Sequence, residues 1–106
     1  MIISTTENVA GHVIVENLGT VIGNTIRARH LGKDIMAGFR TIIGGEIKEY
    51  TGMLAESREQ ALIRMEEKAQ KLGANAVVGV RFQTSMILSG TAELLVYGTA
   101  VKLDRR

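Results

Sequence analysis

EIKEYTGMLAESREQALIRMEEKAQKLG, residues 46–73, decides the fold of this chain because it predicts one long amphipathic helix. Apolar residues recur along it at helical spacing, and charged residues lie mostly on the opposite side. The apolar stripe consists of Ile47, Tyr50, Leu54, Ala61, Met65, Ala69 and Leu72, and Arg58 falls in its middle. Since Gly73 is a good C-terminal cap, we expect the helix to span about residues 46–72.

Segments rich in β-branched residues flank this helix and predict strands. Residues 12–27 are expected to form one kinked strand or two short ones, in which Gly19 and Gly23 mark a bend, a bulge or a close backbone approach. Residues 76–83, with an extension that could reach Leu88, and residues 92–103 are expected to form the other strands.

A short helix is also expected over residues 32–43, before Gly44-Gly45 interrupts the helical pattern. Together these elements predict an α+β fold of two layers, in which an antiparallel sheet packs on one long helix plus a short helix. A chain of 106 residues fits one domain, and no linker or repeat divides it, so we expect a single domain over residues 1–106.

The last strand is apolar on both faces. Leu94, Val96 and Ala100 point one way, and Leu95, Tyr97, Val101 and Leu103 point the other way. A strand of this kind is covered on both faces, but one long and one short helix cover only one face of the sheet. We therefore expect a second copy of the chain to cover the other face, with ring symmetry as one natural solution.

Composition argues against several classes of protein. The absence of cysteine excludes disulfides, thiolate metal sites and thiol catalysis. The net charge of +2 and the presence of only four aromatic residues do not favour nucleic-acid binding. We find no signal peptide and no apolar run long enough to span a membrane, so we expect a cytoplasmic protein without a membrane partner.

Four segments in order resemble the YbjQ-like family of small, uncharacterised bacterial and archaeal proteins. They are Gly44-Gly45-Glu46 followed by Tyr50, REQAL at residues 58–62, GANAVVG at residues 73–79 and YGTAV at residues 97–101. The resemblance covers nearly the whole chain. It implies a dodecin-like two-layer subunit and a ring-shaped homo-oligomer, with a pentamer favoured. The family also carries a heavy-metal-binding label.

Ligand counting does not favour a metal site within one chain. Heavy, soft metals prefer thiolates, which are absent, and His12 and His30 do not form a metal-binding pair in the sequence. A ring could still bring one His12 from each subunit around a common axis, where the side chains could hold an ion. The simpler interpretation of His12 is an ordinary strand residue. No cofactor is indicated.

Arg58 is the residue we expect to matter most. A guanidinium in an apolar stripe must find acceptors, because an unpaired buried charge costs several kcal/mol. We expect Arg58 to form an ion pair that fixes the subunit register, and an anion site is the alternative. Glu46 begins the long helix, where it either complements the helix dipole or faces a cleft.

Four further residues are ligand or interface candidates. Tyr50 and Tyr97 are amphipathic residues of the kind found at interfaces. Asn75 follows the helix exit, where it can satisfy loose carbonyl groups of the helix. Thr99 follows Gly98 in the last strand, and we interpret this pair as a close-packing site.

The sequence favours a non-enzymatic, ring-shaped binding or scaffold protein that binds a small ligand or another protein at subunit interfaces. Two alternatives remain open. One is a heavy-metal-binding protein, as the family label says, and the other is an enzyme with an interface active site around Arg58 and Glu46. No set of catalytic residues can be assigned, because neither histidine has a plausible nucleophile near it in the sequence.

Overall fold

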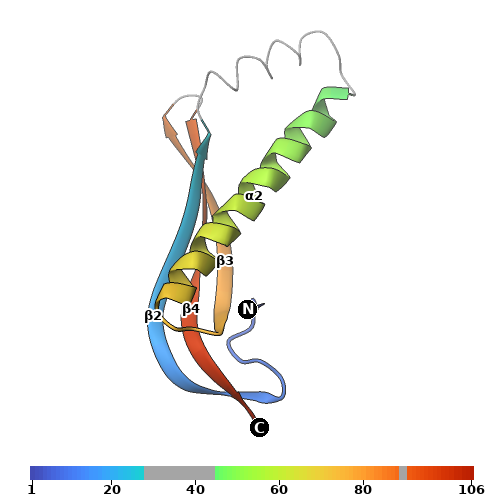
Figure 1. Cartoon of the computed structure of the whole chain (residues 1–106). Helices are drawn as coiled ribbons and strands as arrows, with labels where there is room; N and C mark the ends of the chain where they lie inside the picture. Colours follow the sequence, from blue (N-terminus) through green and yellow to red (C-terminus); the bar gives the residue numbers. More distant parts are fainter. Residues whose placement is uncertain (28–44, 89–90) are drawn as a thin grey trace.

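The computed structural model describes residues 1–27, 45–88 and 91–106 as one helix on a twisted sheet (Figure 1). The elements are β1 (Ile2–Ile3), β2 (His12–Arg27), α2 (Gly45–Lys71), β3 (Ala76–Leu88) and β4 (Thr91–Arg105). The α+β class and the long helix are as predicted. The short helix expected over residues 32–43 lies outside the described residues.

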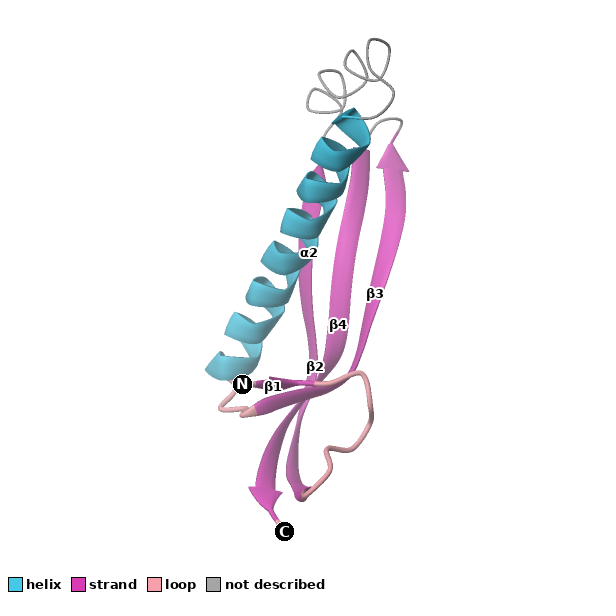
Figure 2. Cartoon of the chain, turned by 90° about the vertical axis from the view of Figure 1, so that its right-hand side faces the viewer, coloured by secondary structure: helices cyan, strands magenta, loops and turns pink. Residues whose placement is uncertain are grey.

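The sheet has the strand order β1-β3-β4-β2, with β4 antiparallel to both of its neighbours (Figure 2). The predicted antiparallel sheet is therefore confirmed for the three long strands. It is wrong for β1, which pairs in parallel with the start of β3 and makes the sheet mixed. Two residues are too few to show a strand period, so the sequence did not reveal β1.

The N-terminal segment continues along the outer edge of β3 beyond β1. Ser4 N donates to Val77 O at 2.9 Å, and Gly79 N donates to Thr6 O at 2.9 Å. Val80 N donates to Ser4 O in the same way. In the described part of the chain, no strand pairs with this edge beyond Val80, so the rest of β3 offers free backbone groups.

β2 is one bent strand, which decides between the two alternatives that the sequence left open (Figure 1). Its pairing with β4 shifts register between Ile14 and Glu16 and again between Asn17 and Gly19. Gly19 has a φ of 103°, a left-handed conformation that side chains rarely adopt. The predicted bulge at Gly19 is therefore confirmed.

α2 covers one face of the sheet and packs mainly on β2 and β4. Its buried residues recur every fourth position: Ser57, Ala61, Met65 and Ala69. They face a cluster formed by Val21 of β2, Val77 and Val80 of β3, and Val96 and Ala100 of β4. The small side chains at three of the four helix positions let the helix backbone come close to the strands.

The predicted stripe is wrong at three positions of α2. Leu54 and Leu72 are 38% and 47% exposed, and Arg58 is exposed as well. Ser57, which is 1% exposed, faces the sheet in place of Arg58. The buried positions of α2 follow a four-residue spacing in place of the predicted stripe, and the N-terminal end of the helix leans away from the strands (Figure 1).

Gly73 caps the C-terminal end of the helix, as predicted. The last helical residue is Lys71, one residue before the expected end. Gly73 adopts a left-handed φ of 85°, its N–H donates to Gln70 O at 3.0 Å, and Ala74 N donates to Ala69 O at 3.1 Å. This pair of bonds is the Schellman motif, which satisfies carbonyl groups at a helix end.

The second face of the sheet is covered at one end by the chain itself. Val101 and Leu103 are 1% and 6% exposed, because Val9 from the N-terminal segment packs against their cluster. The expectation that a second copy must cover this face is therefore wrong at that end. Farther along, Tyr97 and Ile22 lie side by side on the same face, and both remain exposed.

Gly23 sets how closely α2 approaches β2. A Cβ atom at this position would overlap the carbonyl oxygen of Ala61 and lie 2.5 Å from the backbone nitrogen of Met65. The predicted close backbone approach is thus found at Gly23. Because both neighbours are backbone atoms, they can move away only if the helix moves.

We expect Gly23→Ala to lower the free energy of unfolding by about 1–3 kcal/mol or more, because the helix must shift off the strand. Urea unfolding followed by circular dichroism measures this loss. Gly52→Ala is the control, since Gly52 is an exposed residue of α2 with open space around it. This variant should unfold with the same free energy as the wild type or with up to about 1 kcal/mol more. Equal stability of wild type and Gly23→Ala would contradict the close contact.

Candidate functional site

A hollow of about 700 Å³ lies where the N-terminus, the end of α2 and the end of β4 meet. Its polar lining includes His12, Gln70, Asn75, Asp104 and Arg105. The fold thus brings together two of the residues singled out from the sequence, His12 and Asn75. They meet because the start of β2 pairs with the end of β4, next to the exit of α2.

Asn75 is fixed in this hollow by the backbone of β4. Its Nδ2 donates to Leu103 O at 2.9 Å, and Leu103 N donates to its Oδ1 at 2.8 Å. The expected contact with carbonyl groups of the helix is not the one formed, because the Schellman motif already uses them. The Asn75 amide instead extends the pairing of β3 with β4 by one step.

His12 has one ring nitrogen engaged and one available. Its Nδ1 lies 2.9 Å from Ala10 O, and since a carbonyl oxygen only accepts, Nδ1 carries the proton. Nε2 then keeps its lone pair, which is the arrangement found in histidines that bind metal ions. The half-buried ring therefore has the chemistry of a ligand, whether or not other donors join it.

The described residues do not supply those other donors within one chain. They contain no group of three or more His, Cys, Asp or Glu side chains placed to hold an ion. Asp104 lines the same hollow as His12, and two such groups leave a metal site incomplete. The described residues of one chain therefore do not form a complete site for a heavy metal.

Arg58 lies on the exposed surface of α2. Its guanidinium is hydrated there, so the charge needs no buried partner inside the chain. Its expected role at a subunit interface stays a prediction. Glu46 and Tyr50 belong to α2, but their side chains lie outside what the structure describes, so their distance from Arg58 is not tested.

Tyr97 and Thr99 occupy the second face of the sheet, beside Ile22 and Thr20 of β2. Gly98 between them is buried on the opposite face, where a Cβ atom would lie 2.7 Å from Cγ1 of Val77. The predicted close-packing site at Gly98 is confirmed by this contact. Tyr97 itself is an exposed aromatic ring in a sheet face that α2 does not cover.

A second exposed apolar surface lies on β3 and was not predicted from the sequence. Phe82 and Met86 are 46% and 72% exposed. They lie beside Val96 and Ala92 of β4, so they belong to the helix-facing side of the sheet, but α2 covers β2 and β4 and leaves β3 largely open (Figure 2). The sequence signal for this surface is the alternation of apolar residues at positions 80, 82 and 86. It predicts that these residues share one face of the strand, but it does not predict that α2 leaves this face uncovered.

These features define a small α+β protein. Its described residues form one helix on a mixed four-stranded sheet, with exposed apolar side chains on both faces of the sheet. No helix in the described part of the chain is long and apolar enough to cross a membrane. The chain belongs to the YbjQ family, whose model matches residues 1–104 and carries the description "putative heavy-metal-binding".

Relatives of full length support this assignment. A UPF0145 protein of Methanosarcina acetivorans is 58% identical over 106 residues, which is all of both chains. A UPF0145 protein of Thermosipho africanus is 57% identical over 105 residues, covering 99% of this chain and 97% of the relative. A solved structure from Pediococcus pentosaceus, of unknown function and assigned to the DUF74 family, matches with a TM-score of 0.65 at 19% identity and 98% coverage of both chains. That likeness shows the shared fold.

We expect Asn75→Ala to lower the free energy of unfolding by about 1–3 kcal/mol, because it leaves the N–H and C=O groups of Leu103 without partners. Chemical denaturation measures the change. Gln70→Ala is a matched control, since Gln70 lines the same hollow and is exposed, as Asn75 is. If the two variants were equally stable, the amide of Asn75 would not support the end of β4, and a role in ligand binding would be the better explanation.

Proposed function

We propose that this chain is the subunit of a ring-shaped homo-oligomer, favoured as a pentamer, that binds a small ligand or another protein at contacts between subunits without catalysing a reaction. The observation that supports the oligomer is the surface that one chain leaves exposed. The number of subunits rests on the family resemblance.

The chain is more extended than a compact domain of its size. Its accessible surface is 7150 Å², whereas a compact monomer of 11.5 kDa exposes about 5,800 Å². Its radius of gyration is 17.2 Å, against about 13 Å for a compact domain of this length. The excess of roughly 1,300 Å² is of the order that a subunit hides in stable interfaces.

The exposed apolar residues lie in two different places. Ile22, Ile26 and Tyr97 share the second face of the sheet, and Phe82 and Met86 lie on the helix-facing side of β3. Two unlike surfaces on one subunit favour head-to-tail contacts, which close into a ring when the rotation between neighbours allows it.

We expect native mass spectrometry of the untagged wild type to show one closed oligomer and Phe82→Glu to shift it to monomers, because a carboxylate would have to be buried in the contact. Ile63→Glu is the control, because Ile63 lies on the outer side of α2 and is 47% exposed, about as exposed as Phe82 at 46%. It should assemble as the wild type does. A monomeric wild type would refute the proposal.

Metal binding across subunits is the second candidate, and the free Nε2 of His12 is the observation that favours it. One chain lacks a full ligand set in its described part, so the ion would have to be shared between copies. Elemental analysis and titration with zinc, nickel, copper and cadmium should then give about one ion per oligomer, lost in His12→Ala. One ion per chain, or unchanged uptake by His12→Ala, would contradict a shared His12 site.

A further inference from the structure

We propose that neighbouring copies dock with the two sides of α2, whose charges are opposite. The basic flank consists of Arg64, Lys68 and Lys71, and the acidic flank consists of Glu59 and Glu66. The basic flank of one copy lies against the acidic flank of the next. This inference rests on the proposed oligomer and says which surfaces of the chain meet in it.

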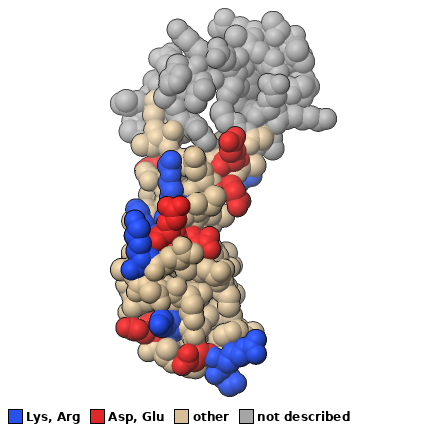
Figure 3. Space-filling view, in the orientation of Figure 1, with Lys and Arg blue, Asp and Glu red and all other residues tan. Residues whose placement is uncertain are grey.

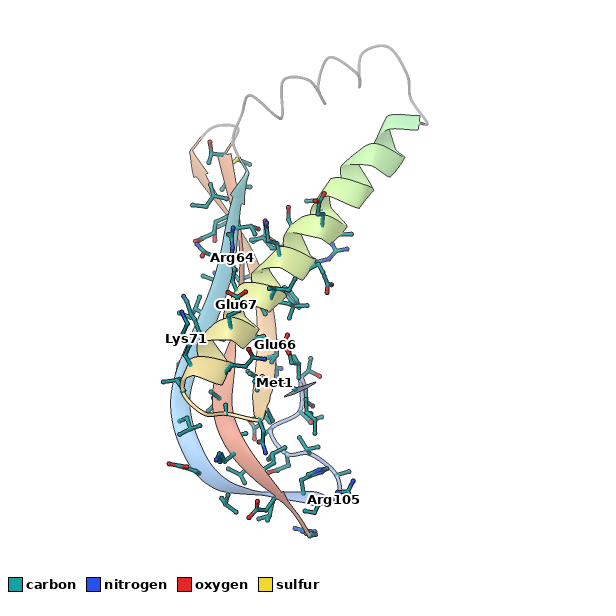
Figure 4. All side chains as sticks on the ribbon, viewed as in Figure 1. Met1, Arg64, Glu66, Glu67, Lys71 and Arg105 are labelled. Carbon is teal, nitrogen blue, oxygen red and sulfur yellow. The ribbon has the colours of Figure 1, made fainter. Side chains whose placement is uncertain are left out.

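The basic flank lies on the β2 side of the helix. Arg64 Nη1 donates to Asn24 O of β2 at 2.6 Å. Lys68 and Lys71 line a shallow hollow together with Thr20, Val21 and Ile22 of the same strand. Figure 4 shows Arg64 and Lys71 on this side of α2 with Glu67 between them, so the flank carries three cations and one carboxylate. Figure 3 shows blue side chains along the same margin of the molecule, with red ones beside them and further blue ones at its lower end. Residues spaced by four and three share one side of a helix, which explains the alignment.

The acidic flank lies on the opposite side of α2, toward β1 and β3. Glu66 Oε1 is 4.0 Å from the amine of Met1, and Figure 4 shows both residues on the side away from Lys71. Glu59 precedes Glu66 by seven residues, close to two helical turns, and is exposed on the same side. The Met1 amine is therefore a cation of the same chain beside this flank, and the helical wheel puts Arg58 between the flank and the sheet.

The sheet places these flanks so that two copies can bring them together. β2 forms one outer edge, and β3 beyond Val80 forms the other, since β1 and the N-terminal segment cover only the start of β3. If β2 of the next copy lies beside the open part of β3, its helix lies about three strands away, roughly 14 Å. Helices with their side chains are about 10–12 Å wide, so extended lysine and glutamate side chains bridge the gap.

The same arrangement covers the exposed apolar side chains of β3. Phe82 and Met86 lie on the helix-facing side, in the space between one helix and the next. Their burial supplies the apolar part of the contact, and the flanking charges select the partner and its orientation. A second copy is the occupant that matches both features, because each chain carries the complement of its own surface.

Charge reversal on one flank tests this docking. Lys68→Glu/Lys71→Glu gives two acidic flanks, and Glu59→Lys/Glu66→Lys gives two basic flanks. In either double variant like charges face each other at every contact. We expect the concentration at which half of the chains are assembled to rise about tenfold or more, measured by mass photometry or light scattering at low salt.

The combined variant, with all four reversals in one chain, distinguishes docking from damage to the fold. It again has opposite charges on its two flanks, so assembly should return to within about threefold of the wild type. Lys102→Glu/Arg106→Glu is the matched control, since it changes the net charge as the lysine pair does and alters exposed cations away from both flanks. It should assemble normally.

The outcomes separate this inference from the proposed function. A wild type that is monomeric overturns both. A wild-type oligomer whose double variants assemble as well as the wild type, or whose combined variant fails to recover, overturns the docking of the flanks and leaves the oligomer standing. If the basic flank instead bound an acidic partner protein, the lysine reversals would leave self-assembly unchanged. That result would also contradict the docking of the flanks.

Discussion

The close contact between α2 and β2 at Gly23 is the constraint on which the rest of the structure depends. Because position 23 carries no side chain, the helix backbone at Ala61 and Met65 comes directly against the strand. The helix is therefore held over one side of the sheet, above β2 and β4, and a cluster of mostly small and β-branched residues fills the interface. Larger residues at 23 or 61 would move the helix outward and open this core.

This position of the helix decides what remains exposed. One helix cannot cover a sheet of three long strands, and the contact at Gly23 draws it toward the β2 edge. β3 is left with exposed apolar residues on the helix-facing side, and within the described ranges the N-terminal segment alone protects part of its outer edge. Long open edges and apolar patches are features that stable proteins hide. The self-association that we propose would thus follow from where the helix packs.

Much of the fold could be predicted from the sequence because periodicity and glycine carry physical information about the backbone. The helix end at Gly73, the bulge at Gly19 and the close approach at Gly23 each need a residue without a side chain. The burial of Ser57 in place of Arg58 could not be predicted, because it depends on the tilt of α2 relative to the strands. The covering of Leu103 by Val9 depends on how the N-terminal segment folds back, for which no local pattern exists. The hollow that contains both His12 and Asn75 likewise depends on the register of β2 and β3 against β4.

The heavy-metal description of the family is compatible with the described residues of this chain if several copies share an ion. Without thiolates, a chain must use imidazole and carboxylate groups, and the described residues of one chain do not gather enough of them. His12 nevertheless has the proton on Nδ1 that a ligand histidine needs. It also stands at the sheet end opposite the open part of β3, so a ligand site there and the docking of the helix flanks would involve different parts of the molecule. A His12 site shared between copies would therefore need a contact between copies at this end of the sheet, separate from the proposed docking of the flanks.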